Sequence, residues 1–231
     1  MNWIINNIDL IWSLTLEHVR LSVPPIVLGF LISIPLGWFA YRFKLTRGIL
    51  LTVAGLLYTI PSLALFVILP PLLGISFLSE LNITIALTLY AVAIMARSVA
   101  DALASVDPAI RQSATAVGFG GWRRFWTVDF PLAGPVVLAG LRVAAVSTVS
   151  LVTVGILIGV ESLGYLFTNG FQRRIIEEIL AGVVMTVIVA LLIDRGLVLL
   201  GRLLMPWTTV KKMKAGQPDA TVGSAVEGAA A

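Results

Sequence analysis

Cysteine is absent from this chain of 231 residues, and histidine occurs only once, as His18. Without cysteine the chain forms no disulfide bond and has no thiolate chemistry. We expect the single histidine to be an exposed bystander, and no metal site is predicted. Charged residues are also scarce, at 12% of the chain against 58% hydrophobic residues. This balance is typical of an all-α protein that crosses a membrane several times.

Motifs for hydrolysis and for ATP use are missing as well. The sequence contains no G-x-x-x-x-G-K-[ST] phosphate loop, no Ser, His and Asp set, and no pair of carboxylates at membrane depth. We therefore expect no enzyme activity, no catalytic residues and no cofactor bound by this chain. The net charge of +4 is modest. Its basic residues flank apolar segments, which indicates a role in membrane orientation and argues against nucleic acid.

Five apolar segments are long enough to cross a bilayer as helices of roughly 20 residues. They are Leu21–Tyr41, Ile49–Leu69, Asn82–Ala100, Leu132–Val160 and Ile179–Leu200. The second is predicted to be one span bent near Pro61. Residues 1–19 mix aromatic and polar side chains, which favours an extracytoplasmic interfacial helix before a transmembrane region of residues 20–205. Residues 206–231, rich in alanine, glycine and small polar residues, are predicted to be a disordered cytoplasmic tail.

Lysine and arginine are distributed unevenly over the two sides of this five-span topology. One side holds Arg42, Lys44, Arg47, Arg97, Arg111, Arg123, Arg124, Arg202, Lys211, Lys212 and Lys214, and the other holds Arg20, Arg173 and Arg174. Basic residues accumulate on the cytoplasmic side of membrane proteins. The amino terminus is therefore predicted to be extracytoplasmic and the carboxyl terminus cytoplasmic.

A polar, glycine-containing segment interrupts the apolar sequence between the third and fourth spans. Residues 112–131 read QSATAVGFGGWRRFWTVDFP. Small residues, the central Gly118 and the terminal Pro131 predict a helix, a tight turn, a second short helix and a stop. Such a segment must face water. We interpret residues 105–131 as a cytoplasmic docking loop.

This loop resembles that of ABC importer permeases, where E-A-A-x-x-x-G is followed, after nine residues, by I-x-L-P. Gln112, Ser113 and Ala114 occupy the E-A-A positions, Gly118 matches the glycine, and Val-Asp-Phe-Pro at residues 128–131 replaces I-x-L-P. Gln112 lacks the family's acid but keeps its hydrogen-bonding capacity. The resemblance implies contacts to a separate ATPase from Gln112, Ser113, Ala114, Gly118, Gly121, Trp122, Arg123, Arg124 and Pro131. Arg123 and Arg124 equally fit an anchoring role at the cytoplasmic membrane surface.

Two further stretches resemble osmoprotectant permeases, which import glycine betaine, choline, carnitine or proline betaine. They are Tyr58–Phe66, with the sequence YTIPSLALF, and Ala139–Arg142, with the sequence AGLR. The resemblance implies a type I ABC importer permease in a bacterial cell membrane. Its implied partners are ATPase subunits that hold ATP and Mg, an extracytoplasmic substrate-binding protein, and a second permease chain, identical or related.

Polar and aromatic residues inside the spans leave alternatives open. Candidates for the transport pathway are Tyr58, Pro61, Ser62 and Tyr90, although Pro61 and Ser62 equally fit a simple helix kink. Trp38 also offers aromatic surface. Four hydroxyls of the fourth span fit helix packing better than substrate contact: Ser147, Thr148, Ser150 and Thr153. Arg142 is predicted to pair with an acid such as Asp194.

The outward-facing residues 161–178 are predicted to be a loop, either a receptor docking surface or an ordinary solvated segment. Two other functions remain compatible with the sequence. One is an ABC importer for methionine, polar amino acids or sulfonates, which would share the docking loop. The other is a self-contained secondary carrier or a membrane scaffold, which co-purification of an ATPase would exclude.

Overall fold

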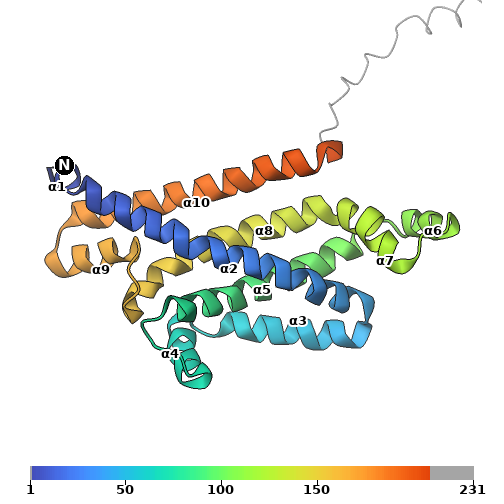
Figure 1. Ribbon diagram of the computed structural model, residues 1–231, viewed down its shortest axis with the longest axis horizontal. Helices are drawn as coiled ribbons and strands as arrows, with labels where there is room; N and C mark the ends of the chain where they lie inside the picture. The colour runs from blue at the N-terminus through green and yellow to red at the C-terminus, as the bar shows by residue number, and fades with distance from the viewer. Residues whose placement is uncertain (1, 209–231) are drawn as a thin grey trace, which may run out of the picture.

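The computed structural model describes residues 2–208, and this part of the chain is helical without strands (Figure 1). Of the predicted tail, residues 206–231, the first three are in a 3-10 helical turn, and residues 209–231 lie outside the described residues. The helices are α1 (Asn2–Asn6), α2 (Ile8–Arg42), α3 (Lys44–Thr59), α4 (Ser62–Leu73), α5 (Glu80–Ala104), α6 (Pro108–Ala116), α7 (Gly121–Arg124), α8 (Phe130–Val152), α9 (Gly164–Arg173) and α10 (Ile176–Leu204). A π-helical turn, η1 (Phe125–Asp129), and two 3-10 segments, η2 (Thr153–Ile158) and η3 (Pro206–Thr208), complete the described chain.

Four helical stretches are long and apolar enough to cross a membrane: α2, α5, residues 121–158 and α10. Helices α3 and α4 qualify as a fifth crossing only as a pair, because they meet at an angle of 106°. The expected all-α fold with about five spans is thus confirmed. The bend predicted near Pro61 is present, but it is a break between two helices and not a curve within one helix. Ile60, which precedes the proline, is extended (φ −66°, ψ 128°), as proline requires of its neighbour.

The amino-terminal segment also differs from expectation. No break separates residues 8–19 from the first span, because α2 runs through both without interruption. The charges that suggested a surface segment are accommodated on the exposed side of this helix. Arg20 bonds Glu17 at 2.7 Å and reaches Glu80 of α5 at 2.5 Å. A change in hydropathy therefore did not mark a helix end here.

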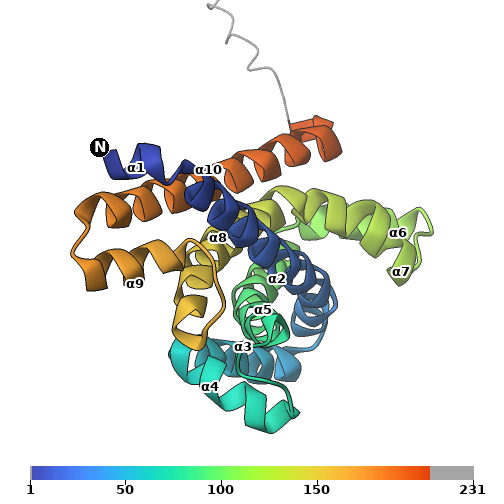
Figure 2. The same ribbon diagram turned by 60° about the vertical axis from the view of Figure 1, so that its left-hand side comes forward.

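Helices α2, α5 and α8 form the centre of the bundle, and α10 and α9 cover one side of it (Figures 1 and 2). Small residues allow the close approach of α2 and α5. A Cβ atom added at Gly37 would lie 2.5 Å from the Cβ atom of Val99, and Gly29 meets Ala91 even more tightly. Helices in membranes commonly use glycine in this way. This contact fixes the central pair, on which the remaining helices are placed.

Two polar contacts connect the bundle laterally. Arg142 of α8 donates to both carboxylate oxygens of Asp194 on α10, at 2.6 and 2.9 Å, which confirms the predicted pair. His18 is not exposed as expected but fully buried, because α2 continues into the core at this point. Its Nε2 lies 3.0 Å from the carbonyl oxygen of Val149 on α8. The histidine is thus a packing contact between two spans.

The predicted outer loop of residues 161–178 is mostly helical, since α9 occupies its middle. Asn169 of α9 donates to a carboxylate oxygen of Glu178 at 2.6 Å, and Glu178 is fully buried in the first turn of α10. Gly170 brings the two helices together, with α9 lying alongside the start of α10 (Figure 1). The outer end of the molecule is therefore a fixed helical hairpin.

Candidate functional site

Helices α6 and α7 project together from one end of the bundle, away from α9 (Figure 1). We call the segment from Pro108 to Asp129 the coupling module. Asp107 caps α6, its carboxylate accepting from the backbone N–H of Ala109 at 2.8 Å, and Pro108 follows in the first helical position. None of the residues of α6 is buried. A helix without a fully buried residue leaves most of its surface free to contact another protein.

The turn between α6 and α7 depends on Gly118. Its backbone adopts φ +95°, in a region that residues with a side chain rarely enter. The N–H of Phe119 donates to the carbonyl of Ala114 at 3.0 Å and closes the end of α6. The predicted helix and tight turn are therefore present, and glycine is needed at the predicted position.

The predicted stop at Pro131 is wrong. From Gly121 the chain stays helical through α7, the π turn η1 and α8, and Pro131 lies in the first turn of α8. The π turn η1 lies directly before α8, so the regular α-helical hydrogen bonding is already interrupted where the proline lacks an N–H group. The second arm of the coupling module is thus continuous with a span. A displacement of this arm would be passed on to α8 directly.

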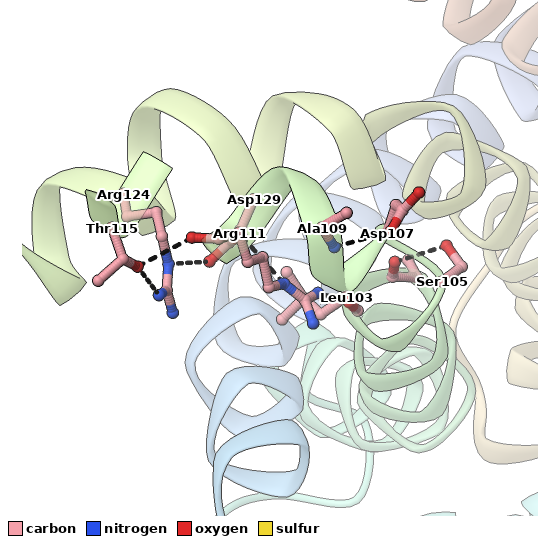
Figure 3. A network of polar contacts seen from close by, with 9 residues as sticks. Leu103, Ser105, Asp107, Ala109, Arg111, Thr115, Arg124 and Asp129 are labelled. Carbon is pink, nitrogen blue, oxygen red and sulfur yellow. Dashed lines mark hydrogen bonds and ion pairs between the residues drawn. The ribbon is translucent and has the colours of Figure 1, made fainter. Parts of the chain in front are cut away.

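Asp129 holds the two arms of the module together (Figure 3). Its side chain is only 5% exposed and accepts from Arg111 of α6 at 3.2 Å and from Arg124 of α7 at 3.3 Å. Arg111 also donates to the carbonyl of Leu103 and stacks over the ring of Tyr41, 4.7 Å from its centre. The buried carboxylate therefore joins η1 to α6 and α7, and Arg111 connects them to the ends of α5 and α2.

Arg124 completes the network by donating to the hydroxyl of Thr115 at 3.0 Å (Figure 3). Arg111, Thr115 and Arg124 surround an open hollow of about 320 Å³ together with Gln112 and Ala116. Gln112 is exposed there, as is Ser113 nearby, while Ala114 is half-buried. Of the residues predicted from the motif, Gln112 and Arg124 thus line this hollow, and Trp122 and Arg123 lie exposed on the second arm.

Three residues of this site were not predicted from the sequence: Asp129, Arg111 and Thr115. The motif assigns no role to the position of Asp129, and its partner Arg111 lies 18 residues away. One signal was available. Asp129 is the only acidic residue between positions 112 and 131 and stands among apolar residues. An isolated acid in such surroundings requires a cationic partner when it is buried.

A second group of predicted residues meets around the break between α3 and α4, beside α5 and α8. Tyr58, Ser62 and Tyr90 line an open cavity of about 440 Å³ with Ser147 and Ser150 of α8. The rings of Tyr58 and Tyr90 are edge to face, with centres 6.0 Å apart. The Tyr90 hydroxyl donates to the carbonyl of Ile60, which the break frees from helical bonding.

The predicted pathway residues have different positions around this cavity. Pro61 creates the break, but its own side chain does not line the cavity. Tyr90 is buried and committed to Ile60, whereas Tyr58 is 51% exposed. Ser147 and Ser150, which we expected to serve helix packing, line the cavity, while Thr148 bonds the carbonyl of Ala144 within its own helix. Trp38 lies elsewhere, beside Phe125 of the coupling module.

Comparison with solved structures supports the expected fold. The methionine ABC transporter MetNI in an inward-facing conformation matches with a TM-score of 0.77, 20% identity, and coverage of 86% of this chain and 98% of the other. An amino acid ABC transporter matches with a TM-score of 0.67 and 14% identity over 88% of this chain and 96% of the other. At these identities the likeness concerns the fold.

Comparison with curated proteins gives relatives of similar length. The osmoprotectant import permease protein OsmW of Salmonella typhimurium is 31% identical over 84% of this chain and 91% of its own. The glycine betaine/carnitine/choline permease OpuCB and the choline permease OpuBB of Bacillus subtilis are each 30% identical, over 82% and 83% of this chain and 86% and 87% of their own. The model of one protein family matches residues 26–210. The chain therefore belongs to the family of binding-protein-dependent transport system inner membrane components.

Proposed function

We propose that this chain is the permease subunit of an ATP-driven importer of osmoprotectants such as glycine betaine. The observation that carries the proposal is the coupling module, which projects from a bundle of spans and is fixed by Gly118 and Asp129. The substrate class is supported by the names of the relatives, which transport osmoprotectants, choline or carnitine.

The energy for import would come from other subunits. The sequence has no phosphate loop, so ATP and Mg would be bound by a pair of ATPase subunits seated on the coupling module. Alternate closure and opening of these subunits would move α6 and α7 as one unit, and the continuous helix from Gly121 would transmit this motion to α8. This chain itself would pass the motion from the ATPase to the spans and would form part of the transport pathway.

The cavity at Tyr58 would form one wall of the transport pathway. It opens sideways from a single bundle of about five spans, and a second permease chain, identical or related, would supply the opposite wall. A betaine carries a permanent quaternary ammonium, which aromatic rings attract without a buried anion. The cavity offers the exposed ring of Tyr58 and the hydroxyls of Ser62, Ser147 and Ser150, which suits weak binding of a zwitterion in transit.

Replacement of Tyr58 tests this role. Tyr58→Leu is expected to lower betaine transport several-fold, because loss of a cation–π contact costs about 0.5–2 kcal/mol. Tyr58→Phe is the matched control, since it keeps the ring, and it should transport at close to the parent rate. Both variants would be compared with the parent in vesicles containing the complete transporter. Equal rates for the leucine and phenylalanine variants would remove Tyr58 from the pathway.

The orientation follows from the charges. Arg47 at the start of α3 bonds Asp101 near the end of α5 that leads to the coupling module, and Arg111, Arg123 and Arg124 lie in the module itself. This end would face the cytoplasm, and α9 would face outward. A substrate-binding protein would then dock near α9, where Phe171 is 78% exposed and Arg173 and Arg174 are exposed beside it. The family's dependence on a binding protein supports such a surface.

Single cysteines test the orientation, since the chain has none of its own. Phe171→Cys is expected to react with a membrane-impermeant thiol reagent in intact cells, and Gly120→Cys in the coupling module should react only after the membrane is opened. Both positions are exposed, so access depends on the side of the membrane. Phe171 is a better site than Asn169, which is half-buried against Glu178. Labelling at position 120 in intact cells would reverse the proposed topology.

Uptake measurements test the substrate. Cells with and without the gene would be supplied with labelled glycine betaine, choline, carnitine or methionine, at low and at raised osmolarity. We expect uptake of at least one quaternary amine to be lost with the gene. Loss of methionine uptake alone would refute the osmoprotectant assignment and leave an importer permease. Purification without any ATPase would refute the importer itself.

A further inference from the structure

An apolar groove lies between α2 and the second arm of the coupling module. It has a volume of about 340 Å³, and it is lined by Leu31, Ile34, Trp38 and Phe39 of α2 and by Trp122 and Trp126 of the module. We call it the tryptophan groove. The side chains of Trp122 and Trp126 are 72% and 44% exposed. Three of the six tryptophans of the chain, Trp38, Trp122 and Trp126, therefore gather at one place at the edge of the core.

The groove has the direction and length of part of a lipid chain. Leu31 and Phe39 are eight residues apart on a helix that crosses the membrane, so they are separated by about 12 Å along its axis. One leaflet of the hydrocarbon core is about 15 Å deep. The groove thus begins within the apolar layer and ends at the tryptophans of the coupling module. Tryptophan prefers this headgroup boundary because its ring has an apolar body and a polar N–H group.

Two arginines stand at the headgroup end of the groove without a carboxylate partner. Arg42 follows Phe39 by one turn of α2, and Arg123 precedes Trp126 by one turn in the module. Both are exposed, and neither forms an ion pair within residues 2–208. Arg123 only stacks over the ring of Phe119, 5.0 Å from its centre. This end of the groove therefore carries uncompensated positive charge.

We propose that the tryptophan groove binds one anionic phospholipid of the cytoplasmic leaflet. An acyl chain would lie along α2, and the phosphate would be held by Arg42 and Arg123. The placement in that leaflet rests on the proposed orientation of the permease. The charge complementarity selects an anionic headgroup, since each basic side chain near the surface favours anionic lipid. Such a lipid would join the first span to the arm that receives the force of the ATPase.

Quenching of tryptophan fluorescence tests the proposal on the full-length chain. Trp3, Trp12 and Trp207 would be replaced by phenylalanine, which leaves the three groove tryptophans as reporters. The protein would be placed in phosphatidylcholine vesicles with increasing fractions of brominated phosphatidylglycerol or, in parallel, brominated phosphatidylcholine. Half-maximal quenching is expected at a fraction of phosphatidylglycerol roughly fivefold or more below that of brominated phosphatidylcholine. Fluorescence quenching involves no transport, so the result does not depend on the proposed substrate. Both leaflets of the vesicles have the same lipid composition, so the result does not depend on the proposed orientation either.

Arginine variants identify the site. In the double variant with Arg42→Gln and Arg123→Gln, the two brominated lipids should quench the tryptophan fluorescence at equal lipid fractions. The control is Arg97→Gln with Arg202→Gln, which removes the same charge from two other exposed arginines and should leave the difference intact. Equal quenching by both lipids in the parent would mean an ordinary lipid annulus and would overturn the proposal. Weak quenching by both would mean that a second copy of the chain covers the groove, and would overturn it as well. The parent comparison needs no arginine variant, so misfolding of a variant does not prevent the test.

Discussion

A Gly118→Val variant is expected to reach the membrane in normal amount and to transport at least roughly fivefold more slowly than the parent. Gly118 has φ +95°, and a β-branched residue in such a conformation costs on the order of 1–3 kcal/mol, which corresponds to a change in rate of roughly 5- to 150-fold where the turn must be retained during the cycle. The turn would relax instead, and α6 and α7 would lose their relative orientation. Transport and ATP hydrolysis would be measured together in vesicles that contain the complete transporter.

Gly120→Val is the matched control two residues away. Gly120 has φ −66° and ψ 156°, an ordinary extended conformation. A Cβ atom at either glycine would meet no other atom within 4 Å, so the two variants differ in backbone strain and not in crowding. Gly120→Val should therefore transport at close to the parent rate. If both valine variants transport equally well, the conformation of the turn has no part in coupling.

The spans could be predicted from the sequence because hydropathy over some twenty residues reports directly on the membrane. The geometry between them could not. Pro61 predicted an interruption, but the angle of 106° depends on distant contacts. Tyr90 binds the freed carbonyl of Ile60, and Asn82 of α5 donates to the carbonyl of Phe66 on α4 at 2.9 Å. Neither contact has a local signal in the sequence.

The burial of single polar residues such as His18 could not be predicted from the sequence either. His18 stands in a stretch whose charges suggested a surface position, yet helical periodicity turns it toward α8 while Glu17 and Arg20 remain outside. Because α2 continues through this stretch, its faces decide burial and the average composition does not. The pair of Arg142 and Asp194 was predictable, because a charged group at membrane depth requires a partner and few acids are available there.

In the coupling module, too, features that depend on neighbouring residues could be predicted, whereas contacts between distant residues could not. The spacing of Gln112 and Gly118 indicated a helix and a turn, since both features depend on neighbouring residues. Pro131 was interpreted as a stop, although a helix can continue past a proline where its regular hydrogen bonding is already interrupted. What decides between these is the helix that precedes it, which includes the π turn η1. The contacts of Asp129 arise only when the two arms fold against each other.

Asp129→Asn is expected to reduce transport at least tenfold and to lower the thermal stability of the chain. The carboxylate is 5% exposed and faces two guanidinium groups, so its neutralisation leaves Arg111 and Arg124 close together without a counter-charge. Removal of one partner from a buried ion pair costs on the order of 3 kcal/mol. The two arms should separate, and ATP hydrolysis by the assembled transporter should continue without import. Transport per ATP hydrolysed is the measurement.

Two further variants separate the network from a general loss of acid charge. Asp107→Asn makes the same chemical change at the exposed cap of α6, where asparagine caps as well as aspartate, and should leave transport almost unchanged. Arg124→Gln added to Asp129→Asn removes one of the two uncompensated charges, so the double variant should recover part of the lost coupling. This recovery would not occur if Asp129 contacted the ATPase directly. Transport by Asp129→Asn equal to that of Asp107→Asn would show that the buried carboxylate does not hold the module in its working shape.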